Sequence, residues 1–63
     1  MQEFQQRVVD EKKELDVKLD ALVKFFETPI FSGLPNDEQD RLAKQAEYMG
    51  KYSEILKDRI AAF

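Results

Sequence analysis

Apolar residues in the first part of the chain recur at the spacing of an α-helix. Residues 3–27 contain no proline or glycine, and their apolar positions are four, seven, four, three and four residues apart, at Phe4, Val8, Leu15, Leu19, Leu22 and Phe26. These steps place the side chains on one helical face, whereas a strand would alternate at every second residue. We therefore predict an amphipathic helix over residues 3–27.

A second apolar pattern runs through the rest of the chain. Its steps are four, three, three, four, four and three, at Leu42, Ala46, Met49, Tyr52, Leu56, Ile60 and Phe63. This spacing is close to a heptad repeat, which favours two helices that pack antiparallel and nearly aligned. We predict a helix over residues 36–62, with Tyr52 in its packed face.

Residues 28–35 separate the two patterns and contain both prolines and Gly33. Thr28 and Pro29 suit the cap and the first position of one short helical turn. The apolar residues of this elbow are expected to fold back on Phe25 and Phe26, and they are Ile30, Phe31 and Leu34. The pattern predicts an all-α fold: an antiparallel two-helix hairpin with a Pro/Gly elbow, forming a single domain over residues 1–63.

A chain of 63 residues has little core of its own. Chains of this size bury only about 60% of the surface that they expose when unfolded. Neither cysteine nor histidine is present to supply a disulfide or a common metal ligand. Several apolar residues also fall beside the two stripes, namely Val9, Val23, Phe25, Ala43 and Ile55. We therefore expect homo-oligomerisation to stabilise the hairpin.

Charge and composition exclude several function classes. The net charge of −3 disfavours a protein that grips a nucleic-acid polymer, because that grip needs a positive surface. The apolar runs are too short to cross a membrane, and the N-terminus lacks the features of a signal peptide. We expect a soluble protein of the cytoplasm.

The chemistry of catalysis is missing from the sequence. No serine or cysteine has a histidine partner, no glycine-rich loop precedes a helix, and no metal-ligand spacing is present. The carboxylate pairs Asp16/Asp20 and Glu54/Asp58 are assigned to the solvated face, where a small protein carries most of its charge. We predict no enzymatic activity, no metal and no cofactor.

Lys12 stands out by its position. It lies four residues after Val8 and three before Leu15, at the edge of the apolar stripe. In an oligomer, Lys12 and Arg7 are candidates to line a seam that receives an anionic ligand. The alternative is that Lys12 lays its stem along apolar surface and puts its ammonium in water beside Glu11.

Two further residues are candidates for ligand contacts. Phe4, outside the closed part of the hairpin, offers a flat face on which a base can stack, a contact worth about 1–3 kcal/mol. Arg59 lies beside Ile60 on the second helix, where it suits either a ligand or a carboxylate of a neighbouring subunit.

The order of residues resembles a known family. The runs "EKxELDxKLxxLxxF" from Glu11 to Phe25 and "EQxRLxxQxxxMxxYxxxLxxRI" from Glu38 to Ile60 flank the elbow. In this order they resemble the small phage proteins that defeat CBASS immunity by sequestering cyclic oligonucleotides.

The resemblance implies a homohexamer of helical hairpins in the cytoplasm of the infected host. Such proteins bind cyclic dinucleotides, and in some members cyclic trinucleotides, without cleaving them. By resemblance, Lys12 is the candidate phosphate ligand, Phe4 the candidate stacking ring, and Arg59 a candidate for a second pocket. The alternative function is a self-associating hairpin that acts as a protein–protein adaptor and binds no nucleotide.

Overall fold

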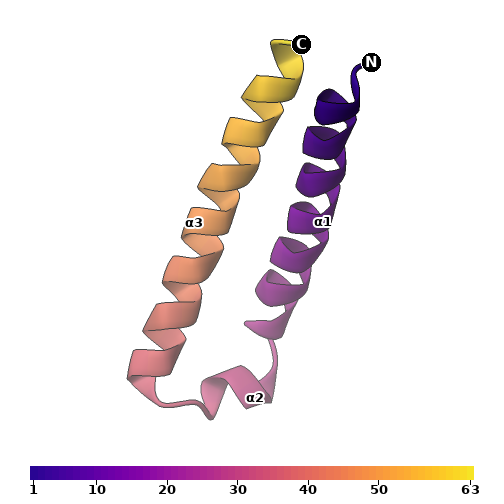
Figure 1. Cartoon of the computed structure of the whole chain (residues 1–63). Helices are drawn as coiled ribbons and strands as arrows, with labels where there is room; N and C mark the ends of the chain where they lie inside the picture. The colour runs from indigo at the N-terminus through magenta and orange to yellow at the C-terminus, as the bar shows by residue number, and fades with distance from the viewer.

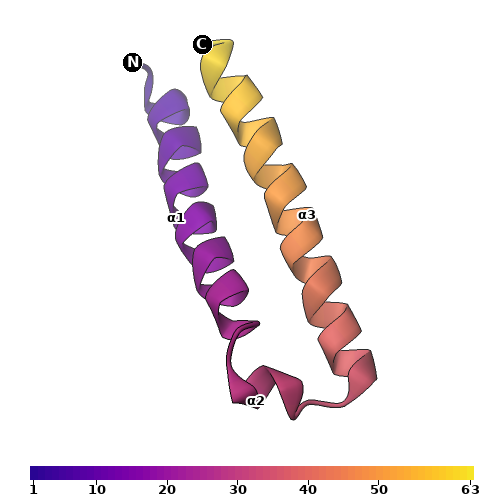
Figure 2. The ribbon, with the colours of Figure 1, turned by 180° about the vertical axis from the view of Figure 1, so that it is seen from behind.

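The computed structural model describes residues 1–63 and consists of helices joined by short turns. Helix α1 spans Glu3–Phe25, α2 spans Pro29–Ser32 and α3 spans Asn36–Ala61. The two long helices run antiparallel side by side, with α2 at one end and both termini at the other (Figures 1 and 2). The all-α hairpin predicted from the sequence is confirmed. The molecule is a rod of 46 × 14 × 13 Å.

The elbow explains why α1 ends at Phe25 and not at residue 27. The Thr28 amide donates to the Phe25 carbonyl at 3.0 Å, an i→i−3 bond that tightens the last turn. The Thr28 hydroxyl also donates to that carbonyl at 2.8 Å and accepts from the Phe31 amide at 3.3 Å. Pro29 occupies the first position of α2. The prediction that Thr28 and Pro29 begin a short helical turn is confirmed.

Aromatic side chains close the elbow end of the hairpin. The ring of Phe31 lies 4.8 Å from that of Phe26 and 6.0 Å from that of Phe25, measured between centroids. Leu34 is partly buried, whereas Ile30 is exposed. The expected folding back therefore holds for Phe31 and is wrong for Ile30, because one turn of helix can present only one side to α1 and α3.

The packed interface between α1 and α3 is narrow. Only Val8 and Leu56 are buried, with 6% and 0% of their surface exposed. The remaining interface positions are half-buried, and they include Leu15, Leu19, Leu22, Leu42, Ala46, Met49 and Ile60. A single pair of helices leaves one side of each apolar face open to solvent.

The prediction that Tyr52 packs in the interface is wrong, since 41% of its surface is exposed. Ser53 is half-buried in its place. Starting from Leu42, the observed seam of α3 steps by four, three, four, three and four, through Ala46, Met49, Ser53, Leu56 and Ile60. Alternating steps keep one line of residues facing a partner helix, whereas two successive steps of three turn away from it.

Leu56→Ala is expected to destabilise the hairpin by about 2–5 kcal/mol, because it removes the one fully buried side chain and leaves a cavity. Denaturant unfolding followed by helical circular dichroism measures the loss. Lys57→Ala, at the exposed neighbouring position, is the control and should change stability by no more than about 0.5 kcal/mol. Equal stability of the two variants would contradict the assignment of Leu56 to the core.

Candidate functional site

A polar layer interrupts the apolar seam between the long helices. On α1 the seam steps by four, three, four, three and four from Val8, through Lys12, Leu15, Leu19, Leu22 and Phe26. Lys12 therefore occupies a position that faces α3, and Ser53 occupies the matching position on α3. Because the helices are antiparallel, the two side chains meet across the interface, 41 residues apart in sequence.

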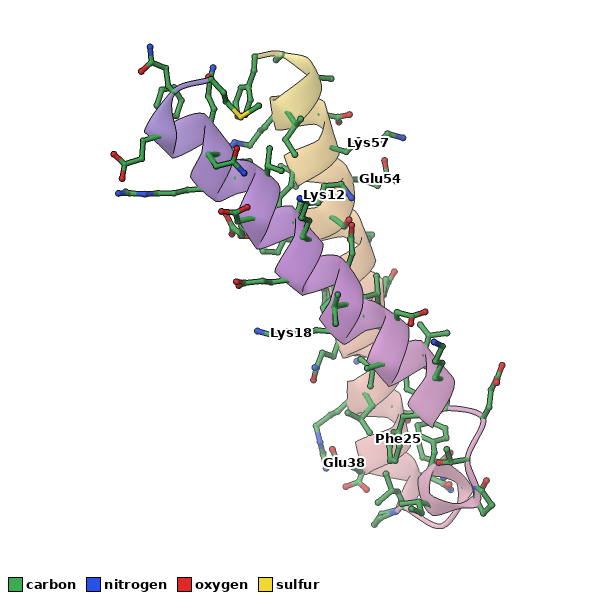
Figure 3. The ribbon with its side chains drawn as sticks, turned by 90° about the vertical axis from the view of Figure 1, so that its right-hand side faces the viewer. Lys12, Lys18, Phe25, Glu38, Glu54 and Lys57 are labelled. Carbon is green, nitrogen blue, oxygen red and sulfur yellow. The ribbon has the colours of Figure 1, made fainter.

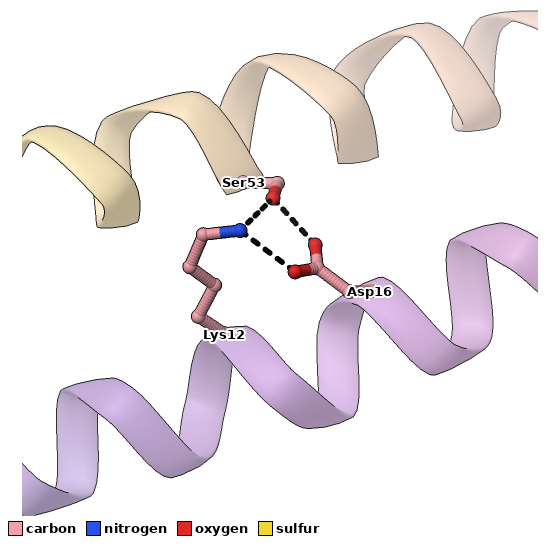
Figure 4. Close-up of polar contacts among 3 residues, drawn as sticks. All are labelled: Lys12, Asp16 and Ser53. Carbon is pink, nitrogen blue, oxygen red and sulfur yellow. Dashed lines mark hydrogen bonds and ion pairs between the residues drawn. The ribbon is translucent and has the colours of Figure 1, made fainter.

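Three side chains close a ring of hydrogen bonds in this layer (Figure 4). The Lys12 ammonium donates to Asp16 Oδ2 at 2.7 Å and to Ser53 Oγ at 3.0 Å. The Ser53 hydroxyl donates to Asp16 Oδ1 at 2.5 Å. Lys12, Asp16 and Ser53 are named the polar triad below. Each member contacts the other two, so the position of each depends on both helices.

The polar triad lies beside the most tightly packed part of the interface. Val8 is one turn before Lys12 on α1, and Leu56 is one turn after Ser53 on α3. The Lys12 side chain is 25% exposed and that of Asp16 is 45% exposed. In Figure 3, Lys12 lies against α3, whereas Lys18 projects away from it. The ammonium thus sits at the rim of the interface, with its stem along apolar surface.

The contacts of Lys12 correct one part of the alternative in which its ammonium lies in water beside Glu11. Its carboxylate partner is Asp16, one turn along α1, and not Glu11. An ammonium has three donor hydrogens, and Asp16 and Ser53 accept two of them. The third remains for a further acceptor. The arrangement can bind a single oxyanion without disturbing the triad.

The triad also shifts the titration of its carboxylate. The hydrogen bond from Lys12 lowers the pKa of Asp16 below its ordinary value, and the hydrogen bond from Ser53 lowers it further. Both bonds favour the ionised form. Asp16 was assigned from sequence to the solvated face, and the structure instead places it at the helix interface.

The other predicted site residues lie toward the open end of the hairpin. Arg7 is exposed and pairs with Glu3 at 2.7 Å. Phe4 is exposed and makes an edge-to-face contact with Phe63 at 6.2 Å between centroids. Arg59 is exposed in the last turn of α3.

Within one hairpin, the four predicted site residues do not lie close together. At 1.5 Å per residue, Phe4 lies about 12 Å along α1 from Lys12, and Arg7 is turned about 140° around the helix from it. Arg59 lies about 9 Å along α3 from Ser53. Of these four residues, only Lys12 has polar partners on both helices.

Sequence reasoning missed Asp16 and Ser53 as partners of Lys12. The available signal was the strict alternation of four and three, which selects Ser53 over Tyr52 on α3 and places Lys12 in the same seam on α1. Asp16 follows Lys12 by four residues, the spacing at which opposite charges meet on a helix.

Other features of the chain do not form a second site. A shallow depression on α1 is lined by Lys13, Glu14, Val17 and Lys18, all from one helix. No group of three or more acidic side chains is arranged to hold a metal ion. No helix combines the length and the apolar character that crossing a membrane requires.

Acid is expected to weaken the hairpin through Asp16. Because its pKa is lower in the folded than in the unfolded chain, its stabilising contribution is complete above the unfolded value of about 3.9 and is lost as the pH falls through the lower folded value. Denaturant titrations at a series of pH values should show Asp16→Asn differing most from the unaltered protein near neutrality and converging with it in acid. Asp10→Asn controls for the change in charge. A difference independent of pH would contradict this assignment.

Comparison with known proteins places the chain in a family. A family described as Sequestin matches residues 2–62. An uncharacterized 7.5 kDa protein from the denB-rIIB intergenic region of Enterobacteria phage T4 is 40% identical over 60 residues, which cover 95% of this chain and 94% of that protein. No solved structure matches the chain.

The family match spans both long helices, and the match to the phage relative covers 95% of the chain. The family is named for sequestration, which is a binding role, and not for a reaction. The chain belongs to the Sequestin family and is related to a small phage protein.

Proposed function

We propose that this chain is a phage anti-defence protein that sequesters cyclic di- and trinucleotide second messengers without cleaving them, and so blocks activation of CBASS effectors. The observation that carries the proposal is Lys12, a partly buried ammonium at the helix seam with one donor hydrogen free for a phosphate oxygen. The family's name and the phage relative support a sequestering role.

The chemistry of the ligand suits an assembly of identical hairpins. A cyclic dinucleotide carries two phosphates and two bases, so it offers the same groups twice. A two-fold interface between copies of the chain brings each binding residue together with its equivalent. Two copies of Lys12 would then face the two phosphates. A net charge of −3 permits this, because the ligand meets only the local charges.

The remaining candidate residues have separate roles in the proposal. Phe4 stacks on a base, for which its exposed ring is available beside Phe63. Arg7 adds positive charge on α1 near the same end. Arg59, exposed on α3, contacts ligand at a second pocket that accepts cyclic trinucleotides. Bacterial messengers are made inside the cell, so the protein acts in the cytoplasm of the infected host.

The proposed assembly is a homohexamer. One hairpin buries only two of its 63 residues and exposes nine large apolar ones. Three of these share one face of α3, at i, i+4 and i+7: Tyr48, Tyr52 and Ile55. Burying such a face between copies supplies the apolar contact that a single hairpin lacks.

One observation favours the alternative of a protein–protein adaptor. In the free chain the charge of Lys12 is already balanced by Asp16. An adaptor binds no anionic ligand, so its lysine needs such a partner within the chain. The exposed face of Tyr48, Tyr52 and Ile55 would then receive a partner protein. The two functions differ in whether any cyclic nucleotide binds.

Lys12→Ala is expected to weaken binding of 3′,3′-cyclic GMP-AMP by about tenfold to a hundredfold, the range for losing a hydrogen bond to a charged group. Isothermal titration measures the affinity, and the ligand should be recovered intact after heat denaturation. Lys13→Ala, an exposed neighbour with the same change in charge, should bind like the unaltered protein. Absence of binding by the unaltered protein to any of a panel of cyclic di- and trinucleotides would favour the adaptor.

The native mass is expected to be about six times the 7.4 kDa of one chain. Light scattering coupled to size exclusion measures it. Ile55→Asp should shift the mass toward that of one chain, because a charge on the apolar face of α3 opposes its burial. Lys57→Asp is the control, because Lys57 is exposed and lies about 160° around the same helix from Ile55. A single chain at all concentrations would exclude the assembly.

A further inference from the structure

We propose that Asp16 and Ser53 are positioning residues that hold Lys12 ready for a phosphate oxygen. The inference rests on the proposed function and names two residues of the same site. Neither residue needs to touch the ligand. Their role is to fix the ammonium at one point of the seam before the ligand arrives, with one donor hydrogen left over.

The flexibility of lysine gives positioning its value. A lysine side chain carries its charge on a four-carbon stem and loses much rotational freedom when it grips an anion. Where folding has already restricted the stem, binding restricts it less, and affinity rises. Lys12 is restricted in this way, because its stem is largely buried and its ammonium has partners on both helices.

Ser53 is the member that ties the lysine to the second helix. Its hydroxyl accepts from Lys12 at 3.0 Å and donates to Asp16 at 2.5 Å, so it joins both charged groups. Without this hydroxyl, Lys12 and Asp16 would form a pair within one helix. Such pairs hold their side chains weakly.

The chain contains a comparison pair that lacks this third partner. The Lys24 ammonium lies 2.8 Å from Asp20 Oδ2, at the same four-residue spacing on α1. The side chains of Asp20 and Lys24 are 64% and 74% exposed. No residue of α3 bonds to them. Neutralising Asp20 therefore changes the net charge as neutralising Asp16 does, but leaves Lys12 in place.

Charge and positioning predict opposite effects for Asp16. If Asp16 acts only through its negative charge, removing that charge favours an anionic ligand, and Asp16→Asn binds at least as well as Asp20→Asn. If Asp16 positions Lys12, its replacement loosens the ammonium, and Asp16→Asn binds more weakly than Asp20→Asn.

The decisive variant is Ser53→Ala, which leaves the net charge unchanged and introduces the residue that helices favour most. Isothermal titration with 3′,3′-cyclic GMP-AMP should show an affinity about three- to tenfold lower than that of the unaltered protein, the equivalent of one net hydrogen bond. Ser53→Thr, which keeps the hydroxyl, should restore most of the affinity. Helical circular dichroism and native mass should be the same for all three proteins.

A spectroscopic signature separates positioning from a general structural effect. In ¹⁵N nuclear magnetic resonance, the Lys12 ammonium of the ligand-free protein should exchange its hydrogens slowly, because two are bonded to Asp16 and Ser53. Ser53→Ala should speed this exchange, while the Lys24 ammonium should not change.

The outcomes distinguish this inference from the function on which it rests. If the unaltered protein binds and Ser53→Ala binds equally well, or Asp16→Asn matches Asp20→Asn, the positioning role is overturned and the sequestering role stands. If the unaltered protein binds no cyclic nucleotide, both are overturned. Weaker binding by Ser53→Ala with rescue by Ser53→Thr supports the positioning role.

Discussion

The interface between α1 and α3 is the contact on which the rest of the structure depends. Helix α2 is a single turn at one end, so only the two long helices can bury apolar surface against each other. Two helices share one seam, and that seam encloses Leu56 and Val8 while leaving its other members half-exposed. Because this interface is narrow, each of its positions contributes a large share of the packing between the helices. It also leaves apolar faces of α1 and α3 available for contact with other copies.

The polar triad occupies a layer of this seam that an apolar pair would fill in a simpler hairpin. A polar group at such a position lowers stability but selects one register. If the helices slipped by one heptad, Ala46 or Ile60 would replace Ser53 opposite Lys12. The ammonium would then lose its partner on α3. The triad therefore penalises the slipped pairings, and the Pro/Gly elbow opposes them from the other end.

The same layer links the fold to the proposed function. An ammonium exposed on a helix surface is mobile and surrounded by water, whereas Lys12 is partly desolvated and bonded to both helices. Such a group interacts with a phosphate more strongly than a fully hydrated one does. The chain can thus be acidic as a whole and still hold a cationic hydrogen-bond donor at a fixed point of the seam, with its charge balanced by Asp16. Membership of the Sequestin family fits a protein with a sequestering role.

The sequence by itself determined the two long helices, the elbow and the hairpin, because apolar spacing and proline positions act locally. It also singled out Lys12, whose place beside the apolar stripe is visible without a structure. The apolar stripe placed Tyr52 in the packed face, although the alternation of four and three favours Ser53, and the packing of α3 against α1 decided for Ser53. The partners of Lys12 were likewise decided by tertiary structure. Asp16 is one helical turn from Lys12 on the same helix, but Ser53 is 41 residues away in sequence, and the packing of α3 against α1 brings it to Lys12.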